Sequence, residues 1–81
     1  MDVEEIREGV LTILKELHED IDFEAEDKMV EDKILDSFDL VTLATELGEE
    51  FDVDITAKDF IAENFNSVDS LADMIARLLE E

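Results

Sequence analysis

Two adjacent residues, Asp36 and Ser37, are the best candidates for chemistry in this 81-residue sequence. They stand where an acidic segment ends and a helical pattern begins, and either residue is well suited to cap that helix. The free N–H groups and the positive end of the helix dipole at such a position would also stabilise a phosphate attached to the serine hydroxyl. Ser37 is therefore a candidate helix cap and a candidate site of covalent modification.

Self-activated catalysis by Ser37 is not expected. A nucleophilic serine needs a general base within hydrogen-bonding reach, and the only histidine, His18, lies at the far end of the preceding predicted helix. The sequence also has no nucleophile-elbow motif. We expect His18 to be solvated and to stabilise the dipole of its helix.

Calcium binding is the main alternative chemistry in so acidic a chain. Two EF-hand frames can be drawn, one with Asp52, Asp54, Thr56 and Glu63 and the other with Asp20, Asp22, Glu24 and Glu31. The sixth position, where the loop needs glycine for its sharp turn, is Ala57 or Ala25. A specific metal site is not expected, although weak divalent binding to the acidic clusters is compatible with the sequence.

The charge of the chain limits its partners. The formal net charge is -20, from 26 acidic against 6 basic residues, so nucleic acid and anionic membranes should be repelled and partners should present basic surfaces. There is no cysteine, no long apolar run for membrane insertion and no signal-peptide pattern. We expect a cytoplasmic protein with a single domain over residues 1–81.

Hydrophobic periodicity predicts the elements that position Asp36 and Ser37. Apolar residues at helical spacing predict a first helix over 2–18, capped by Asp2, and a second over 37–51. Between them, 19–35 reads as a long loop held by hydrophobic anchors, which are Ile21, Phe23, Met29, Val30, Ile34 and Leu35.

The remainder of the chain is predicted to be helical apart from short connections. An extended connector over 52–56 leads to a short helix over 57–62, capped by Thr56, with Phe60 and Ile61 pointing inward. Residues 64–67 read as a turn, and Ser67 or Asn66 caps the last helix. The apolar stripe of that helix is Val68, Leu71, Met74, Ile75, Leu78 and Leu79. Three long helices, one short helix and no strand predict an all-α bundle.

The second predicted helix has an acidic side opposite its core stripe. This side could be an ordinary solvated surface or a docking face for an enzyme with basic residues around its active-site mouth. Its members are Asp39, Thr42, Glu46, Glu49 and Glu50.

The complete pattern resembles the acyl carrier protein family, including the peptidyl and D-alanyl carriers. The resemblance covers essentially the whole chain and rests on four segments in order. These are Leu35-Asp36-Ser37-Phe38, Glu49-Glu50-Phe51, Val53-Asp54-Ile55 and Phe65-Asn66-Ser67-Val68.

The resemblance implies a small monomeric four-helix bundle without catalytic activity. It implies that a phosphopantetheinyl transferase uses coenzyme A to attach 4′-phosphopantetheine to Ser37, and that the arm then carries acyl or aminoacyl thioesters. It also implies that Asp36 helps the transferase recognise the carrier. The acidic residues Asp39, Glu46, Glu49 and Glu50 would contribute to docking of the loading and acceptor enzymes.

The residues around Ser37 bear on the pathway. Leu35-Asp36-Ser37-Phe38 is closer to the pattern of D-alanyl carriers than to the Gly-x-Asp-Ser-Leu pattern of many fatty-acid carriers. However, Asp39 stands where D-alanyl carriers often have glycine, and residues 64–67 lack the tryptophan common in that group. We favour a specialised pathway, with fatty-acid synthesis as the alternative. A non-enzymatic acidic interaction or cation-responsive module, with Ser37 only a helix cap, is the competing hypothesis.

Overall fold

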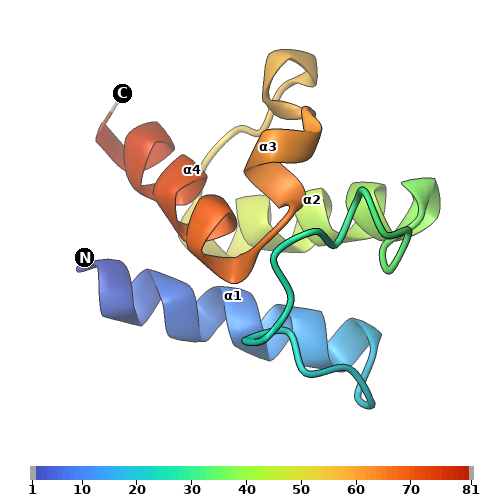
Figure 1. Ribbon diagram of the computed structural model, residues 1–81. Helices are drawn as coiled ribbons and strands as arrows, with labels where there is room; N and C mark the ends of the chain where they lie inside the picture. Colours follow the sequence, from blue (N-terminus) through green and yellow to red (C-terminus); the bar gives the residue numbers. More distant parts are fainter. Residues whose placement is uncertain (1, 81) are drawn as a thin grey trace.

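The computed structural model describes residues 2–80, and these residues form helices and connecting loops without a strand (Figure 1). This confirms the predicted all-α class. The elements are α1 (Val3–Leu17), α2 (Ser37–Phe51), the 3-10 helix η1 (Ala57–Asp59), α3 (Ala62–Phe65) and α4 (Val68–Glu80).

The two long helices at the start of the chain have well-defined ends. Asp2 caps α1 by accepting a 2.9 Å hydrogen bond from the Glu5 N–H, as predicted. Helix α2 spans the predicted residues 37–51, with Asp36 as its N-cap. It ends at Phe51, and its C-cap is Asp52, whose backbone is left-handed (φ 54°) and whose N–H donates to the Gly48 carbonyl.

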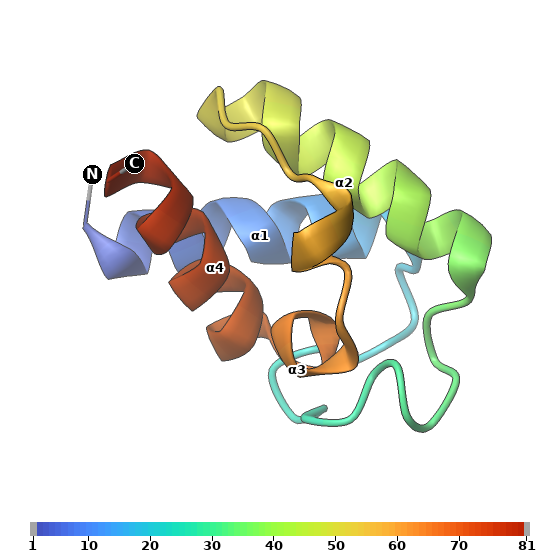
Figure 2. The same cartoon turned by 90° about the horizontal axis from the view of Figure 1, so that it is seen from above.

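Helix α1 packs against both α4 and α2 and so forms the base of the bundle (Figures 1 and 2). Helices α1 and α2 run in opposite directions, which places the beginning of α2 beside the end of α1. The small helix α3 packs on α4. The core between these helices is apolar. Its fully buried side chains are Ile6, Val10, Leu14, Phe23, Met29, Leu43, Leu47, Phe65, Val68, Leu71, Met74 and Ile75.

Two glycines allow close approaches of neighbouring groups. A Cβ at position 9 would lie 2.7 Å from Cζ of the Phe51 ring, so Gly9 lets the end of α2 pack directly on α1. A Cβ at position 48 would lie 3.0 Å from the Val53 carbonyl oxygen, where the chain folds back after α2. The sequence offered no reason for a glycine within α2, and this close approach supplies one.

The long loop between α1 and α2 is anchored as predicted. Phe23, Met29 and Leu35 are buried, and the other three predicted anchors are partly buried against the same core. The loop contains one turn of helix-like structure. The Ile34 N–H donates to the Met29 carbonyl and the Lys33 N–H to the Val30 carbonyl. This is a Schellman arrangement in which Lys33, with φ 59°, takes the left-handed position usually given to glycine.

The short helices differ from the prediction. The predicted helix over 57–62 is a three-residue 3-10 helix that ends at Asp59, and a separate helix over 62–65 replaces the predicted turn. Phe60 and Ile61 were expected to point inward, but they are 39% and 49% exposed. The buried aromatic of this segment is Phe65, on which the Phe60 ring stacks with its centroid 5.3 Å away.

The last helix begins as predicted. The Ser67 hydroxyl oxygen accepts a 3.0 Å hydrogen bond from the Ser70 N–H and therefore caps α4. Four residues of the predicted stripe are buried, whereas Leu79 is 38% exposed at the end of the chain. Asn66 has a different function and holds the long loop, because its side-chain oxygen accepts hydrogen bonds from the N–H groups of Val30 and Glu31.

Candidate functional site

Ser37 is an exposed residue at the first position of α2. The residues around it form a capping box, in which the Asp36 carboxylate accepts the Asp39 N–H at 2.8 Å and the Asp39 carboxylate accepts the Asp36 N–H at 3.4 Å. The first N–H groups of a helix have no partner within the helix, and those of Ser37 and Phe38 belong to this first turn. A hydroxyl here is accessible and lies in the positive field of the helix end.

An apolar surface adjoins this hydroxyl. Phe38 is 77% exposed and Val41, one turn further on, is 60% exposed. By contrast, Leu35, just before α2, and Leu43, in its second turn, are buried in the core. The exposure of Phe38 and Val41 was not predicted from the sequence. Helical spacing offered a signal for Phe38, which falls off the stripe that contains Leu43 and Leu47, whereas Val41 flanks that stripe.

The end of α1 is joined to the start of α2 by a side-chain contact. The His18 Nε2 lies 2.8 Å from the Asp39 Oδ2, and only 33% and 16% of the two side chains are exposed. The prediction of a solvated His18 was therefore only partly correct, because the ring is half-buried and contacts a carboxylate 21 positions away in the sequence. The hydrogen bond from His18 lowers the pKa of Asp39, as does the Asp36 N–H, while partial burial opposes the shift.

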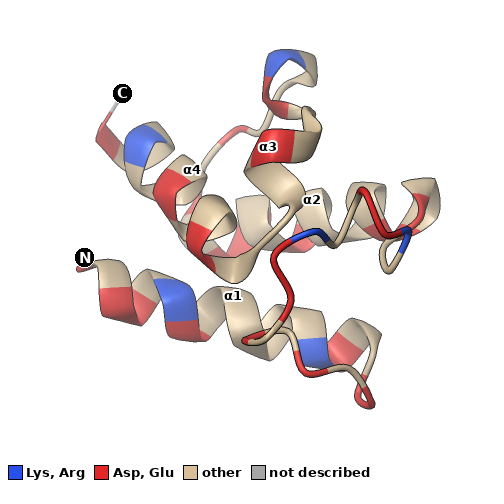
Figure 3. Ribbon diagram, in the orientation of Figure 1, with Lys and Arg blue, Asp and Glu red and all other residues tan. Residues whose placement is uncertain are grey.

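The residues of the predicted acidic face of α2 differ in their exposure and in their contacts. Asp39 is committed to His18 and the capping box, whereas Glu46 and Thr42 are half-buried and Glu49 and Glu50 are exposed. Acidic residues colour much of the chain in Figure 3, with few basic residues among them.

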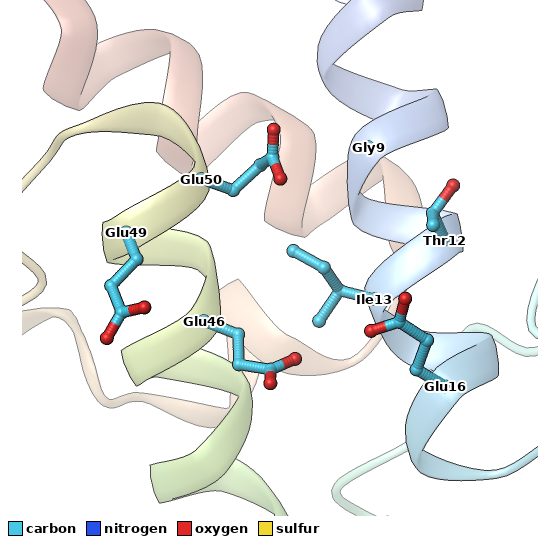
Figure 4. Close-up of a pocket in the computed structure, with 7 residues that line it drawn as sticks. All are labelled: Gly9, Thr12, Ile13, Glu16, Glu46, Glu49 and Glu50. Carbon is cyan, nitrogen blue, oxygen red and sulfur yellow. The ribbon is translucent and has the colours of Figure 1, made fainter.

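A groove of about 510 Å³ lies on the surface between α1 and the second half of α2 (Figure 4). Glu46 and Glu50 extend from α2 toward α1, Glu16 extends from α1, and Ile13 points between the two helices. The contribution of α1 to this surface was not predicted, because it depends on how the two helices pack. Gly9, Thr12 and Glu49 complete the lining.

Over residues 2–80, the side chains of His, Asp and Glu nowhere gather in groups of three that could hold a metal ion. In the same part of the chain, no helix has the length and apolar character needed to cross a membrane.

The family described as "Phosphopantetheine attachment site" matches residues 4–75, which is most of the chain and includes the turn that carries Ser37. The chain matches no curated protein. The covalently attached 4′-phosphopantetheine is the prosthetic group of that family.

Proposed function

Since this chain belongs to the phosphopantetheine-attachment family, we propose that Ser37 is its attachment residue and that the protein carries acyl or aminoacyl groups as thioesters on the arm. Carrier domains of this family interact with a phosphopantetheinyl transferase and with partner enzymes. The observation that supports Ser37 is its exposed position in the first turn of α2. The other two serines, Ser67 and Ser70, are hydrogen-bonded to each other at the start of α4.

The attachment is a phosphoryl-group transfer. The Ser37 hydroxyl oxygen forms a bond to the phosphorus that bears pantetheine, and the pyrophosphate bond of coenzyme A breaks. Adenosine 3′,5′-bisphosphate leaves with the bridging oxygen, and the hydroxyl proton passes to a base of the transferase. In this scheme the carrier supplies the nucleophilic oxygen and its position, while the transferase supplies the catalytic groups.

Partner enzymes are proposed to dock on α2. Glu46, Glu49 and Glu50 form the charged part of this docking face, with Thr42 beside them and Asp39 at its beginning. Asp36, whose side chain is exposed next to Ser37, is proposed to contribute to recognition by the transferase. The exposed side chains of Phe38 and Val41 give that enzyme an apolar contact beside the hydroxyl.

The cargo is proposed from the residues around the attachment site. Leu35-Asp36-Ser37-Phe38 supports a specialised pathway with an acyl or aminoacyl cargo, and fatty-acid synthesis is the alternative. The intact thioester on protein isolated from its native host would be identified by mass spectrometry. A long unsubstituted acyl chain would contradict the specialised pathway.

Mass spectrometry tests the attachment residue. The protein is incubated with coenzyme A and a permissive phosphopantetheinyl transferase, and addition of one phosphopantetheine is expected. Ser37→Ala should abolish the addition, whereas Ser67→Ala and Ser70→Ala should be modified fully. Addition to Ser37→Ala, or no addition to the wild type with several transferases, would contradict the proposal and favour an acidic interaction module.

A further inference from the structure

One carboxylate oxygen connects the end of α1 with the residue that precedes Ser37. The Asp39 Oδ2 lies 2.8 Å from the His18 Nε2, and the same atom accepts the Asp36 N–H at 3.4 Å. The capping box is reciprocal, since the Asp36 Oδ1 accepts the Asp39 N–H at 2.8 Å. His18 therefore contacts the capping box itself and not merely the surface of α2.

His18 and Asp39 lie at the ends of two helices that the chain itself connects only through the long loop. His18 is the C-cap of α1 and its N–H donates to the Leu14 carbonyl, so its backbone is fixed to α1. Asp39 lies in the first turn of α2, two residues after Ser37. A hydrogen bond between them fixes the first turn of α2 in relation to the last turn of α1.

The two side chains of the pair are less exposed to solvent than those of an ordinary surface contact. The side chain of Asp39 is only 16% exposed and that of His18 is 33% exposed. Solvent screens the attraction between partly buried polar groups less than it screens the attraction between fully exposed ones. The chain also contains a useful contrast. Arg7 and Asp69 are equally close, at 2.8 Å, but the Asp69 side chain is 79% exposed and the contact lies in the other half of α1.

We propose that His18 and Asp39 are positioning residues for the modification of Ser37. Neither residue touches the coenzyme in this scheme. They hold the capping box, and with it the Ser37 hydroxyl, in the orientation that the transferase requires. This inference rests on the proposed attachment at Ser37 and extends it to two residues outside the reacting group.

Steady-state kinetics of a phosphopantetheinyl transferase acting on the apo protein tests the inference. His18→Ala should lower kcat about tenfold with little change in KM, because a misdirected hydroxyl reacts slowly although the docking surface is intact. Partial unfolding would have a different signature, since it reduces the concentration of competent substrate and raises the apparent KM alone. His18→Gln retains a nitrogen donor near the position of the histidine Nε2 and should recover most of kcat.

Three further variants complete the test. Arg7→Ala breaks the contact of equal length between α1 and α4 and should leave kcat unchanged. Asp39→Ala and the double variant His18→Ala/Asp39→Ala should have the same kcat, because the histidine has no partner once the carboxylate is removed. In ¹H–¹⁵N spectra, His18→Ala should shift the Ser37 and Phe38 amides, whereas Arg7→Ala should not.

The outcomes separate this inference from the proposed function. Wild-type kcat in His18→Ala, or an equal loss of kcat in Arg7→Ala, would overturn the positioning function while attachment at Ser37 stands. Absence of modification in the wild-type protein would overturn the proposed attachment instead. A tenfold loss in His18→Ala with recovery in His18→Gln would support both.

Discussion

The backbone N–H of Met29 donates to the carbonyl oxygen of Asn66 over 2.9 Å, which ties the long first loop to the junction between α3 and α4. The Asn66 side chain extends the contact, because its oxygen accepts the Val30 N–H at 3.0 Å and the Glu31 N–H at 3.3 Å. The Met29 carbonyl in turn accepts the N–H groups of Ile34 and Leu35. The chain that leads into α2 is thus held by one residue from the other half of the protein.

Replacement of Asn66 should therefore weaken the fold. Asn66→Ala leaves the Val30 and Glu31 N–H groups without their acceptor, and we expect a loss of about 1 kcal/mol in the free energy of unfolding. Urea denaturation followed by circular dichroism measures the change. Asn66→Asp keeps an acceptor oxygen at the same position and is the matched control. Equal stability of Asn66→Ala and the wild type would show that solvent replaces these hydrogen bonds.

A second prediction concerns the left-handed backbone of Lys33. Only glycine adopts this conformation without a steric cost from Cβ, so Lys33→Gly should raise the free energy of unfolding by about 1 kcal/mol. Lys28→Gly removes the same charge from the same loop at a residue whose φ is not positive, and it should give no gain. The difference between the two variants isolates the backbone effect. An equal gain for both would show that the left-handed backbone of Lys33 is not its cause.

The lowered pKa of Asp39 predicts that part of the folding stability is lost at acidic pH. A carboxyl group with a lower pKa in the folded protein than in the unfolded chain contributes stability above its unfolded pKa of about 3.9, and this contribution is lost as the pH falls through the folded pKa. Asp39→Asn should be less stable than the wild type by about 1 kcal/mol at pH 6, and the difference should shrink toward pH 3. Comparing Asp39→Asn with the wild type at the same pH removes the general effect of acid on the stability of a highly charged chain.

The carboxyl group of Asp39 can also be observed directly. Its ¹³C resonance should titrate with a midpoint below the ordinary value for aspartate, and the midpoint should rise in His18→Ala, because the hydrogen bond from His18 is the largest cause of the shift. A midpoint that does not change in His18→Ala would contradict the contact.

Charge reversal tests the docking face. Glu50→Lys and Glu46→Lys should each slow modification or loading by about three- to tenfold at low ionic strength, and the differences should diminish as salt is added. Asp73→Lys makes the same change of charge at an exposed position of α4 and is the control. If all three variants were slowed equally, net charge and not a docking face would explain the rates.

The sequence was sufficient to predict the long helices and the position of Ser37. Apolar residues at helical spacing, together with the caps Asp2 and Ser67, determine elements locally, and the structure confirms them. The short helices were not predicted correctly. That segment has three large apolar side chains that could each pack into the core. Only Phe65 is buried, whereas Phe60 and Ile61 are exposed.

Contacts between distant parts of the chain could not be predicted either. The contact of His18 with Asp39 depends on how the helices pack, and so do the hydrogen bonds from the long loop to Asn66. No local sequence pattern indicates either contact. The groove could not be predicted either, because Glu16 and Glu46 line the same groove only when α1 and α2 are packed together.

The packing of Gly9 against Phe51 implies that these two positions constrain each other during divergence of the family. A larger residue at position 9 would meet the aromatic ring at 2.7 Å, so it should be accepted only in chains that have a smaller side chain at position 51. Gly9→Ala alone should then be harmful, and Phe51→Leu should compensate for it in part. Relatives should accordingly show paired substitutions at these two sites, one on each of the helices that flank the acidic groove.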